Sequence, residues 1–436
     1  MKDIIALLSC LVPYLDKTIS KQLFQIIVAM LSMTGRITML GISRWTDKGG
    51  SYRTIQRFFN KTITWCKVNW FFIRHNLLNK DNKIAIAADE TVVTKSGKKT
   101  YGIDRFFSSI FSKPVFGISF FCISLLNIKE RTSYPVIMEQ IIKDEEEKST
   151  KQKRTKGKGK RGRPKGSKNT NRREIELPSY LLWVQALLRN LLKLVGRELQ
   201  IMYFVFDGAF GNNNALQMVR QCSLHLISKL RYDSSLWFPY DGAYSGKGRH
   251  KKYGKKLNYT KIPDKYLKST SEEGNLLTKV YQMQMWSKNF PDLLNIVVIV
   301  KRDLKTDTIG WVVLFSSDLD LQWNDLIEYY RLRFHIEFNF RDAKQYWGLE
   351  DFMNVNHIPV YNGANLSMFM VNVSQALLRQ YGVSFSVNDL KSWFRGRKYA
   401  HEIFKLLPEK PEPIIIELIY TKIAALGRIN RSDNVA

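Results

Sequence analysis

Two short apolar runs, each followed by an aspartate, restrict the fold of this chain more than any other feature. Residues 84–88 read Ile-Ala-Ile-Ala-Ala before Asp89, and residues 202–206 read Met-Tyr-Phe-Val-Phe before Asp207. Continuous apolar runs of this length are typical of buried strands. An acid at the end of such a strand projects from the sheet edge. The alternative for either residue alone is an ordinary strand-end turn or cap, but together they predict an α/β domain with two carboxylates at a sheet edge.

The charge of the chain indicates a polyanionic partner. Lys and Arg number 68 against 39 Asp and Glu, so the 436 residues carry a net charge of +29. Nucleic acid is the first expectation and an anionic membrane the second. Four scattered cysteines without a CxxC pair exclude a zinc ribbon and fit a reducing cytoplasm. No apolar run reaches the roughly 18 residues that span a membrane.

Twelve of the basic charges lie between Lys151 and Arg173, interspersed with Gly and Pro and without an acid. We expect a solvated loop over residues 149–174, because it has no apolar side chain to bury. Its centre holds Arg161, Arg163 and Lys165 and resembles an AT-hook, which enters the minor groove of A·T-rich DNA. The alternative is a nonspecific phosphate-binding tether. The remainder of the chain stays basic at about +17.

The first 78 residues predict a helical DNA-binding domain. A helix over residues 37–45, a turn, and a helix over residues 52–59 capped by Ser51 together resemble a helix-turn-helix. The second helix presents three polar side chains on one face at i, i+3 and i+4: Arg53, Gln56 and Arg57. The alternative is an ordinary basic helix face.

The rest of the chain predicts an α/β domain interrupted by an insertion. Strand and helix patterns alternate over residues 79–231 and resume over residues 321–355. Residues 232–320 predict a β-rich insertion, and residues 356–436 a mainly helical C-terminal region.

A third acid lies on a predicted long helix over residues 324–347. Its Tyr330, Arg333, Glu337 and Lys344 fall within an arc of about 60° in a continuous helix, with Arg341 beside them. A carboxylate suits Mg²⁺, and the cations suit phosphates on either side of a cleavage point. The alternative, a solvated face with i,i+4 ion pairs, explains Arg333 with Glu337 but not the remaining pattern.

The spacing Tyr330-x2-Arg333-x3-Glu337-x6-Lys344 resembles the Tyr-Arg-Glu-Lys signature of a family of bacterial insertion-sequence transposases. The resemblance implies a ribonuclease H-like catalytic domain with Asp89, Asp207 and Glu337 as its DDE triad. This triad would hold two Mg²⁺ ions, for which Mn²⁺ can substitute.

The resemblance further implies cut-and-paste transposition through a DNA hairpin by a homodimer on double-stranded DNA, at both transposon ends and target. Tyr330, Arg333 and Lys344 would hold phosphates of the DNA ends. Trp311 stands where relatives carry a tryptophan that stacks on a flipped base, and the alternative is a core tryptophan. Two other functions stay open: a DNA-binding regulator with a vestigial catalytic domain, and a nuclease without strand transfer. We expect a cytoplasmic protein associated with DNA and not with membranes.

Overall fold

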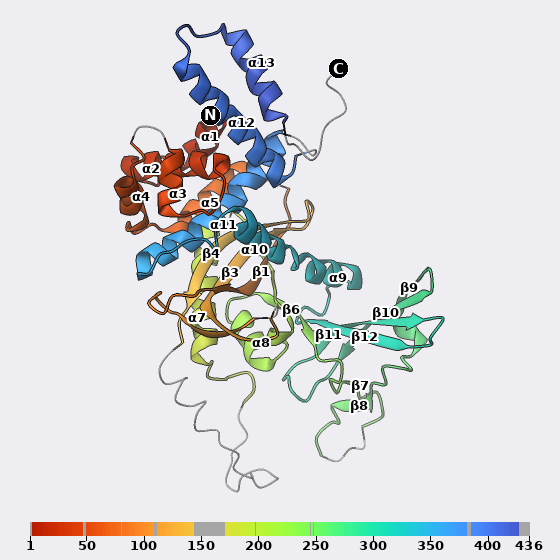
Figure 1. Ribbon diagram of the computed structural model, residues 1–436. Helices are drawn as coiled ribbons and strands as arrows, with labels where there is room; N and C mark the ends of the chain where they lie inside the picture. The colour runs from red at the N-terminus through yellow and green to blue at the C-terminus, as the bar shows by residue number, and fades with distance from the viewer. Residues whose placement is uncertain are drawn as a thin grey trace.

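The computed structural model describes most of the chain (Figure 1). The described residues are 2–46, 49–79, 81–108, 111–143, 171–196, 198–244, 246, 248–381 and 385–426. The predicted minor-groove residues Arg161, Arg163 and Lys165 lie outside this part of the chain. No described helix is both long and apolar enough to cross a membrane.

Five strands form the catalytic sheet: β1 (Ile84–Thr94), β3 (Lys113–Asn127), β4 (Thr132–Ile141), β5 (Tyr203–Val205) and β6 (His225–Leu230). Their spatial order is β4-β3-β1-β5-β6. Strands β1, β3 and β4 pair antiparallel, whereas β5 and β6 run parallel to β1. A three-stranded antiparallel meander, with β5 added parallel to its first strand and β6 added parallel to β5, is the ribonuclease H-like arrangement. The predicted fold is therefore confirmed.

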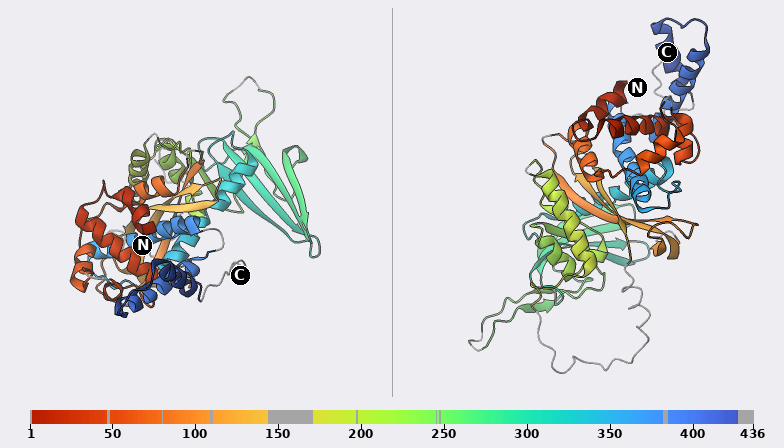
Figure 2. Two further views of the ribbon diagram at one scale, coloured as in Figure 1. Left: turned by 90° about the horizontal axis from the view of Figure 1, so that it is seen from above. Right: turned by 90° about the vertical axis from the view of Figure 1, so that its left-hand side faces the viewer.

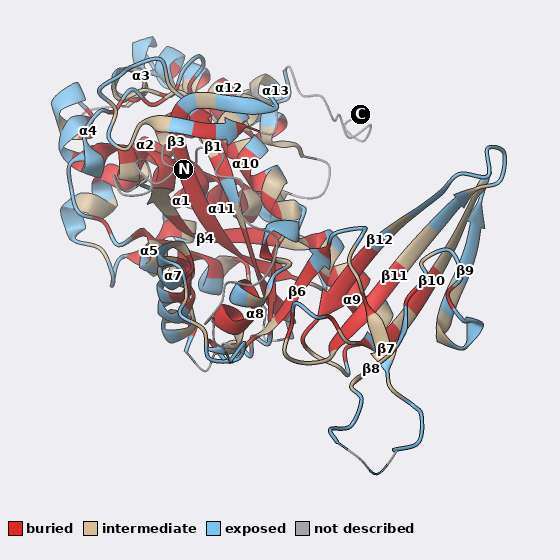
Figure 3. Ribbon diagram, turned by 90° about the horizontal axis from the view of Figure 1, so that it is seen from below, coloured by how far each residue is buried: buried red, intermediate tan, exposed pale blue. Residues whose placement is uncertain are grey.

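The β-rich insertion continues the same sheet. Strand β12 (Ile309–Ser316) pairs antiparallel with β6, and β11 (Leu294–Asp303), β10 (Leu276–Met285) and β9 (Leu267–Glu273) follow in order. These strands project from the helical body as an arm (Figure 2). Burial is greatest near the catalytic strands and decreases toward the far end of the arm (Figure 3).

Three further strands lie at the margins. Strand β2 (Asp104–Ser108) pairs with β3, and β7 (Trp237–Pro239) with β8 (Tyr253–Lys256) forms a separate two-stranded ribbon. The sequence did not predict β2, β7, β8 or β9. They are short or rich in polar residues, so they lack the apolar runs that mark the central strands.

Helices cover both faces of the catalytic sheet. On one face, α7 (Ser179–Val195) buries a stripe at helical spacing and sets Trp183 against Phe121 of β3, with ring centroids 5.5 Å apart. On the other face, Leu326 and Tyr329 of α9 (Trp323–Leu332) share a buried cluster with Ala85 of β1. Helix α8 (Asn213–Arg220) packs beside α7.

The terminal regions are helical, as predicted. The N-terminal helices are α1 (Lys2–Leu8), α2 (Lys17–Ser32), α3 (Met39–Trp45), α4 (Tyr52–Phe59) and α5 (Trp65–Asn76). The C-terminal helices are α11 (His357–Tyr381), α12 (Val387–Leu406) and α13 (Pro413–Ala424). In Figure 1, α12 and α13 rise above the body as a helical hairpin.

Buried asparagines join α11 to the outer strand β4. Asn365 donates to the Met138 carbonyl at 3.0 Å, and Asn372 donates to the Pro135 carbonyl at 2.8 Å. A sheet edge otherwise presents unpaired backbone groups, and each buried unpaired group costs about 1–3 kcal/mol. These amides therefore close the edge of the catalytic sheet against the C-terminal region.

Candidate active site

The sequence predicted that Asp89 ends its strand. In the structure Asp89 lies in the middle of β1. The strand runs on to Thr94 because it stays paired with β3, where Cys122 is the partner of Asp89. The β5 side of β1 is paired only at Ile86 and Ala87. Strand β1 thus continues past Ala87 without β5 beside it, and Asp89 lies next to this unpaired edge of β1.

Strand register brings Asp207 next to Asp89. Ala87 pairs with Val205 in parallel register, and each aspartate stands two residues further along its own strand direction. Asp207 caps a short 3-10 helix (Gly208–Phe210), accepting a hydrogen bond from the Ala209 amide at 2.9 Å. This carboxylate follows its strand as the sequence predicted.

The predicted helix over residues 324–347 is two helices. α9 ends at Leu332 and α10 (His335–Tyr346) begins after a tight turn. The turn forms because the Phe334 amide bonds to the Arg331 carbonyl and the Glu337 amide to the Phe334 carbonyl, both at 3.0 Å and both i to i−3. The prediction of one continuous helix is therefore wrong, although Arg333 and Phe334 at the break keep right-handed helical backbone angles.

Arg333 joins the first and third acids. Its Nη1 lies 3.0 Å from Asp89 Oδ2, and its Nη2 lies 3.5 Å from Glu337 Oε1. The Arg333 side chain is only 12% exposed, and its guanidinium lies 5.8 Å from the centroid of the Tyr330 ring. Tyr330, Arg333 and Glu337 of the signature thus gather beside Asp89.

The carboxylates of this site act on one another. Burial raises the pKa of Asp89, Arg333 opposes the rise, and Asp207 adds to it. The pKa of Glu337 is also raised by burial, against Arg333, with contributions from Asp89 and Asp207. Asp89 and Glu337 therefore have raised pKa values beside a third acid, and a bound cation would relieve this repulsion.

Lys344 of the signature and the nearby Arg341 each bond to groups outside the triad. Lys344 donates from Nζ to the Val92 carbonyl at 2.9 Å and lies 3.4 Å from Glu350 Oε1. Arg341 pairs with its neighbour Asp342 at 3.0 Å. Lys344 therefore fixes β1 three residues beyond Asp89, and the structure does not bring Arg341 to the site.

A cleft of about 560 Å³ opens beside the two aspartates. Glu90 and Tyr180 line it with them, and the Tyr180 hydroxyl donates to Glu90 Oε1 at 2.6 Å. Its other lining residues are Pro178, Leu181, Phe206, Ala209, Phe210, Asn212 and Asn214. The sequence reasoning missed Glu90 and Tyr180, although an acid directly after Asp89 was a visible signal.

The donor chemistry of this site fits a divalent cation. Carboxylate oxygens are the ligands that Mg²⁺ prefers. In the described part of the chain, however, no three His, Cys, Asp or Glu side chains converge closely enough to hold one ion. Arg333 lies between Asp89 and Glu337, so these two acids would close on an ion only after the guanidinium moves.

Trp311 lies on the insertion, beyond the site. Its ring stacks on Tyr259 with centroids 5.4 Å apart, and its Nε1 donates to the Tyr232 carbonyl at 2.8 Å. Phe315 of the same strand pairs with Ser228, whose hydroxyl donates to the Asp207 carbonyl at 2.5 Å. Four residues of strand separate Trp311 from Phe315, roughly 13 Å.

The N-terminal helix-turn-helix residues are arranged as predicted. Ser51 caps α4 by accepting from the Thr54 amide. Arg53, Gln56 and Arg57 are exposed on one face, and the opposite face is buried.

The fold and the paired aspartates agree with the sequence family described as "DDE superfamily endonuclease", which matches residues 10–290. The chain belongs to this family. The match includes Asp89 and Asp207 and ends before Trp311 and the Tyr330–Glu337 segment.

The DDE endonuclease was also compared with solved structures and with curated protein sequences. A piggyBac transposase, solved by cryo-EM as a synaptic complex with hairpin DNA, superposes with a TM-score of 0.41 at 12% sequence identity. The superposition covers 97% of this chain and 79% of that chain. A comparison with curated protein sequences gave no match.

Proposed function

We propose that this DDE endonuclease is a transposase of a bacterial insertion sequence with the Tyr-Arg-Glu-Lys signature. It binds the ends of the element, cuts them and joins them to target DNA. One observation carries the proposal: the β1–β5 register sets Asp89 beside Asp207, and Arg333 ties Glu337 to the same place. This triad lies in a chain whose charge of +29 suits a DNA substrate.

Asp89, Asp207 and Glu337 would hold Mg²⁺, or Mn²⁺ in its place, two ions to a site. Bound there, the metal would lower the pKa of the attacking water and stabilise the leaving oxygen. The acids supply the negative charge, and the Asp207 carboxylate is kept in position by the Ala209 amide. Arg333 would exchange its carboxylate partners for a phosphate of the DNA end.

The path of the DNA follows from the residues around the triad. The Tyr330 hydroxyl and the Arg333 guanidinium would bind phosphates of the cut strand, since both combine donors with a partly buried position beside Asp89. The freed 3′-OH would attack the opposite strand to form a hairpin. Trp311, on the arm beyond Asp207, would stack on a base flipped during that step.

Two DNA ends require two active sites, so we include a homodimer on DNA in the proposal. The α12–α13 hairpin suits a contact between copies because its apolar side chains are exposed: 86% for Leu406, 76% for Ile414 and 55% for Leu418. Exposed apolar clusters of this kind mark interaction surfaces.

The test uses purified full-length protein and duplexes carrying the inverted repeats that flank its coding region. We expect end cleavage that depends on Mg²⁺ and, with target DNA, joined products. Asp89→Asn, Asp207→Asn and Glu337→Gln should each abolish cleavage and retain DNA binding. Glu328→Gln, an acid on α9 paired with Arg131, is the matched control and should cut normally.

Each alternative has its own outcome in this assay. Cleavage without joined products would indicate a nuclease that lacks strand transfer. Specific binding without cleavage, by wild type and variants alike, would indicate a regulator with a vestigial catalytic domain. Substantial Mg²⁺-dependent cutting by any triad variant would remove that residue from the site.

A further inference from the structure

A cluster of basic side chains lies at the junction between the catalytic domain and the insertion. Arg172 and Arg173 enter it from the segment before α7, and Arg220 from the end of α8. Arg249 and Lys252 enter it from the insertion. We call these five residues the junction cluster.

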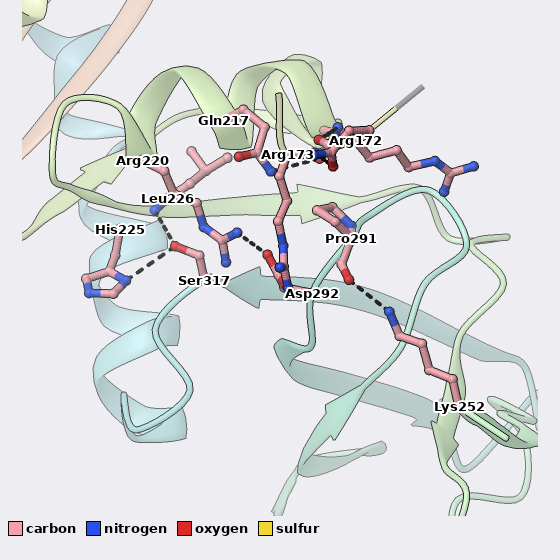
Figure 4. A network of polar contacts seen from close by, with 12 residues as sticks. Arg172, Arg173, Gln217, Arg220, His225, Leu226, Lys252, Pro291, Asp292 and Ser317 are labelled. Carbon is pink, nitrogen blue, oxygen red and sulfur yellow. Dashed lines mark hydrogen bonds and ion pairs between the residues drawn. The ribbon is translucent and has the colours of Figure 1, made fainter. Parts of the chain in front are cut away.

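One carboxylate organises the junction cluster. Arg173 Nε lies 3.2 Å from Asp292 Oδ1, and Arg220 pairs with the other carboxylate oxygen. Figure 4 shows Arg173 and Arg220 converging on Asp292 from the catalytic domain. The Asp292 pKa is held below its ordinary range by hydrogen bonds from both guanidiniums, against burial.

The insertion side is built around Lys252. Its Nζ donates to the Pro291 carbonyl at 2.8 Å (Figure 4). The same Nζ lies 3.5 Å from the centroid of the Trp286 ring. The pKa of Lys252 is lowered, first by burial and then by the nearby charges of Arg173, Arg249 and Arg172. The cations of the two domains are thus close enough to repel one another.

This arrangement leaves a surplus of positive charge. Asp292 offsets one of five cations, and Arg172 and Arg249 are exposed. Among the described residues, Arg172 is bonded through its backbone, whose carbonyl accepts from Asn213 Nδ2 at 2.9 Å. Collecting like charges costs folding free energy, so a built cluster of this kind fits a polyanionic ligand.

Helix α8 relates the junction cluster to the active site. Asn212 and Asn214, at its start, line the cleft with Asp207, and Arg220 ends it. Seven residue steps of helix span roughly 10 Å. A DNA strand advances 3.4 Å per nucleotide along the duplex axis, so this distance corresponds to about three nucleotides.

We infer that the junction cluster binds backbone phosphates of the duplex about three nucleotides from the cut, bridging the catalytic domain and the insertion on one DNA. The inference rests on the proposed function and extends it, because none of these five residues belongs to the triad or the signature. In the free protein Asp292 pairs with Arg173 and Arg220 and offsets part of their charge.

The test measures binding of full-length protein to an uncut end duplex across a salt series. Arg172→Ser with Arg249→Ser removes two charges that make no recorded side-chain bond in the described chain. We expect the slope of log affinity against log salt to become shallower by about 1.8. Arg302→Ser is the matched control: it removes one cation at the other end of β11, roughly 26 Å from Leu294.

Two shortened duplexes test where along the DNA the junction cluster binds. One keeps only two base pairs on the element side of the cut, and the other keeps only two base pairs on the flanking side. The difference between wild type and the double variant should vanish on one of them. Equal slopes for wild type and double variant on the full duplex overturn the inference, as does a difference that survives both truncations.

Asp292→Asn provides an independent test. Releasing two guanidiniums should tighten binding and steepen the slope, whereas weaker binding by a variant with an unchanged melting temperature contradicts the inference. The proposed function fails separately: wild type would then not cut the end duplex with Mg²⁺, whatever its salt slope.

Discussion

Arg333 lies between Asp89 and Glu337, with one guanidinium nitrogen 3.0 Å from Asp89 Oδ2 and the other 3.5 Å from Glu337 Oε1. The guanidinium offsets the two carboxylates where a metal ion would otherwise do so. A DNA phosphate that attracted Arg333 would free both acids at the moment when the substrate arrives.

Replacing Arg333 should therefore change metal binding before any chemistry. Arg333→Met should bind Mn²⁺ at least tenfold more tightly than wild type without DNA, because a competing cation at about 4 Å is removed. The variant should cut DNA ends poorly, having lost a phosphate ligand. Electron paramagnetic resonance of free Mn²⁺ measures the affinity. Arg333→Lys keeps the charge and is the control; equal affinities for all three proteins would contradict the expectation.

Trp311 has a structural contact as well as its proposed role in the hairpin step. Trp311→Ala should reduce hairpin products relative to the first nick and also lower the melting temperature, since it loses the Tyr259 stack and the Tyr232 hydrogen bond. Trp311→Phe should recover most hairpin products because it keeps an aromatic face.

Tyr259→Leu separates the two effects. It removes the stacking partner and leaves the indole in the chain. If hairpin formation falls in Tyr259→Leu in proportion to the melting temperature, as in Trp311→Ala, Trp311 has only its structural role.

The exposed face of α4 should read the DNA end. Gln56→Ala should cost about 1–3 kcal/mol of discrimination at one base pair, because an amide can bond a base edge. Arg53→Ala and Arg57→Ala should weaken binding about equally for all sequences and make the salt dependence shallower. Binding to a panel of single-base variants of the inverted repeat measures both. Arg74→Ala on α5, where Arg74 pairs with Glu198, is the control.

Lys391 gives the fold a pH dependence at alkaline pH. Burial lowers the pKa of its ammonium to about 8, and Nζ donates to the Met30 and Tyr346 carbonyls. Above pH 8 the native protein loses this proton while the unfolded chain keeps it up to about 10.4. The free energy of unfolding should therefore rise by about 2 kcal/mol between pH 8 and pH 10 from this residue.

Urea unfolding at the two pH values checks the effect of Lys391. Lys391→Met should be less stable than wild type at pH 10, and the difference should be smaller at pH 8. A difference that is the same at both values would show that the Lys391 ammonium does not titrate in this range.

The α12–α13 hairpin should carry the contact between copies. Leu406→Glu with Leu418→Glu places charges on its most exposed apolar surface and should convert a DNA-bound dimer into a monomer on each end. Mass photometry with end duplexes measures the stoichiometry. Exposed Tyr232→Glu, on the insertion, is the control. A double variant that still pairs two ends would move the interface elsewhere.

The sequence predicted the parts of this fold that depend on apolar patterning. The apolar runs at residues 84–88 and 202–206 overlap strands β1 and β5, because an uninterrupted apolar run has few other ways to be buried. Helix α4 and its Ser51 cap match fully, since a cap is a local signal.

Pairing and turns could not be predicted in the same way. The apolar run before Asp89 stops, yet β1 continues, because β3 supplies hydrogen bonds as far as Thr94. The break after Leu332 has neither Gly nor Pro to signal it. Glu90 and Tyr180 meet across 90 residues, and single residues of this kind carry no periodicity. The proposed triad could be named from the sequence because apolar runs mark Asp89 and Asp207 and a spaced signature marks Glu337.

The pairing of β12 with β6 has a mechanical consequence. Phe315 on the arm pairs with Ser228, and the Ser228 hydroxyl donates to the Asp207 carbonyl, so a continuous series of hydrogen bonds leads from the insertion to Asp207. A hinge at this junction would have to break strand pairing. The arm thus works as a rigid lever: a torque applied to its outer strands would be delivered to the loop that carries Asp207.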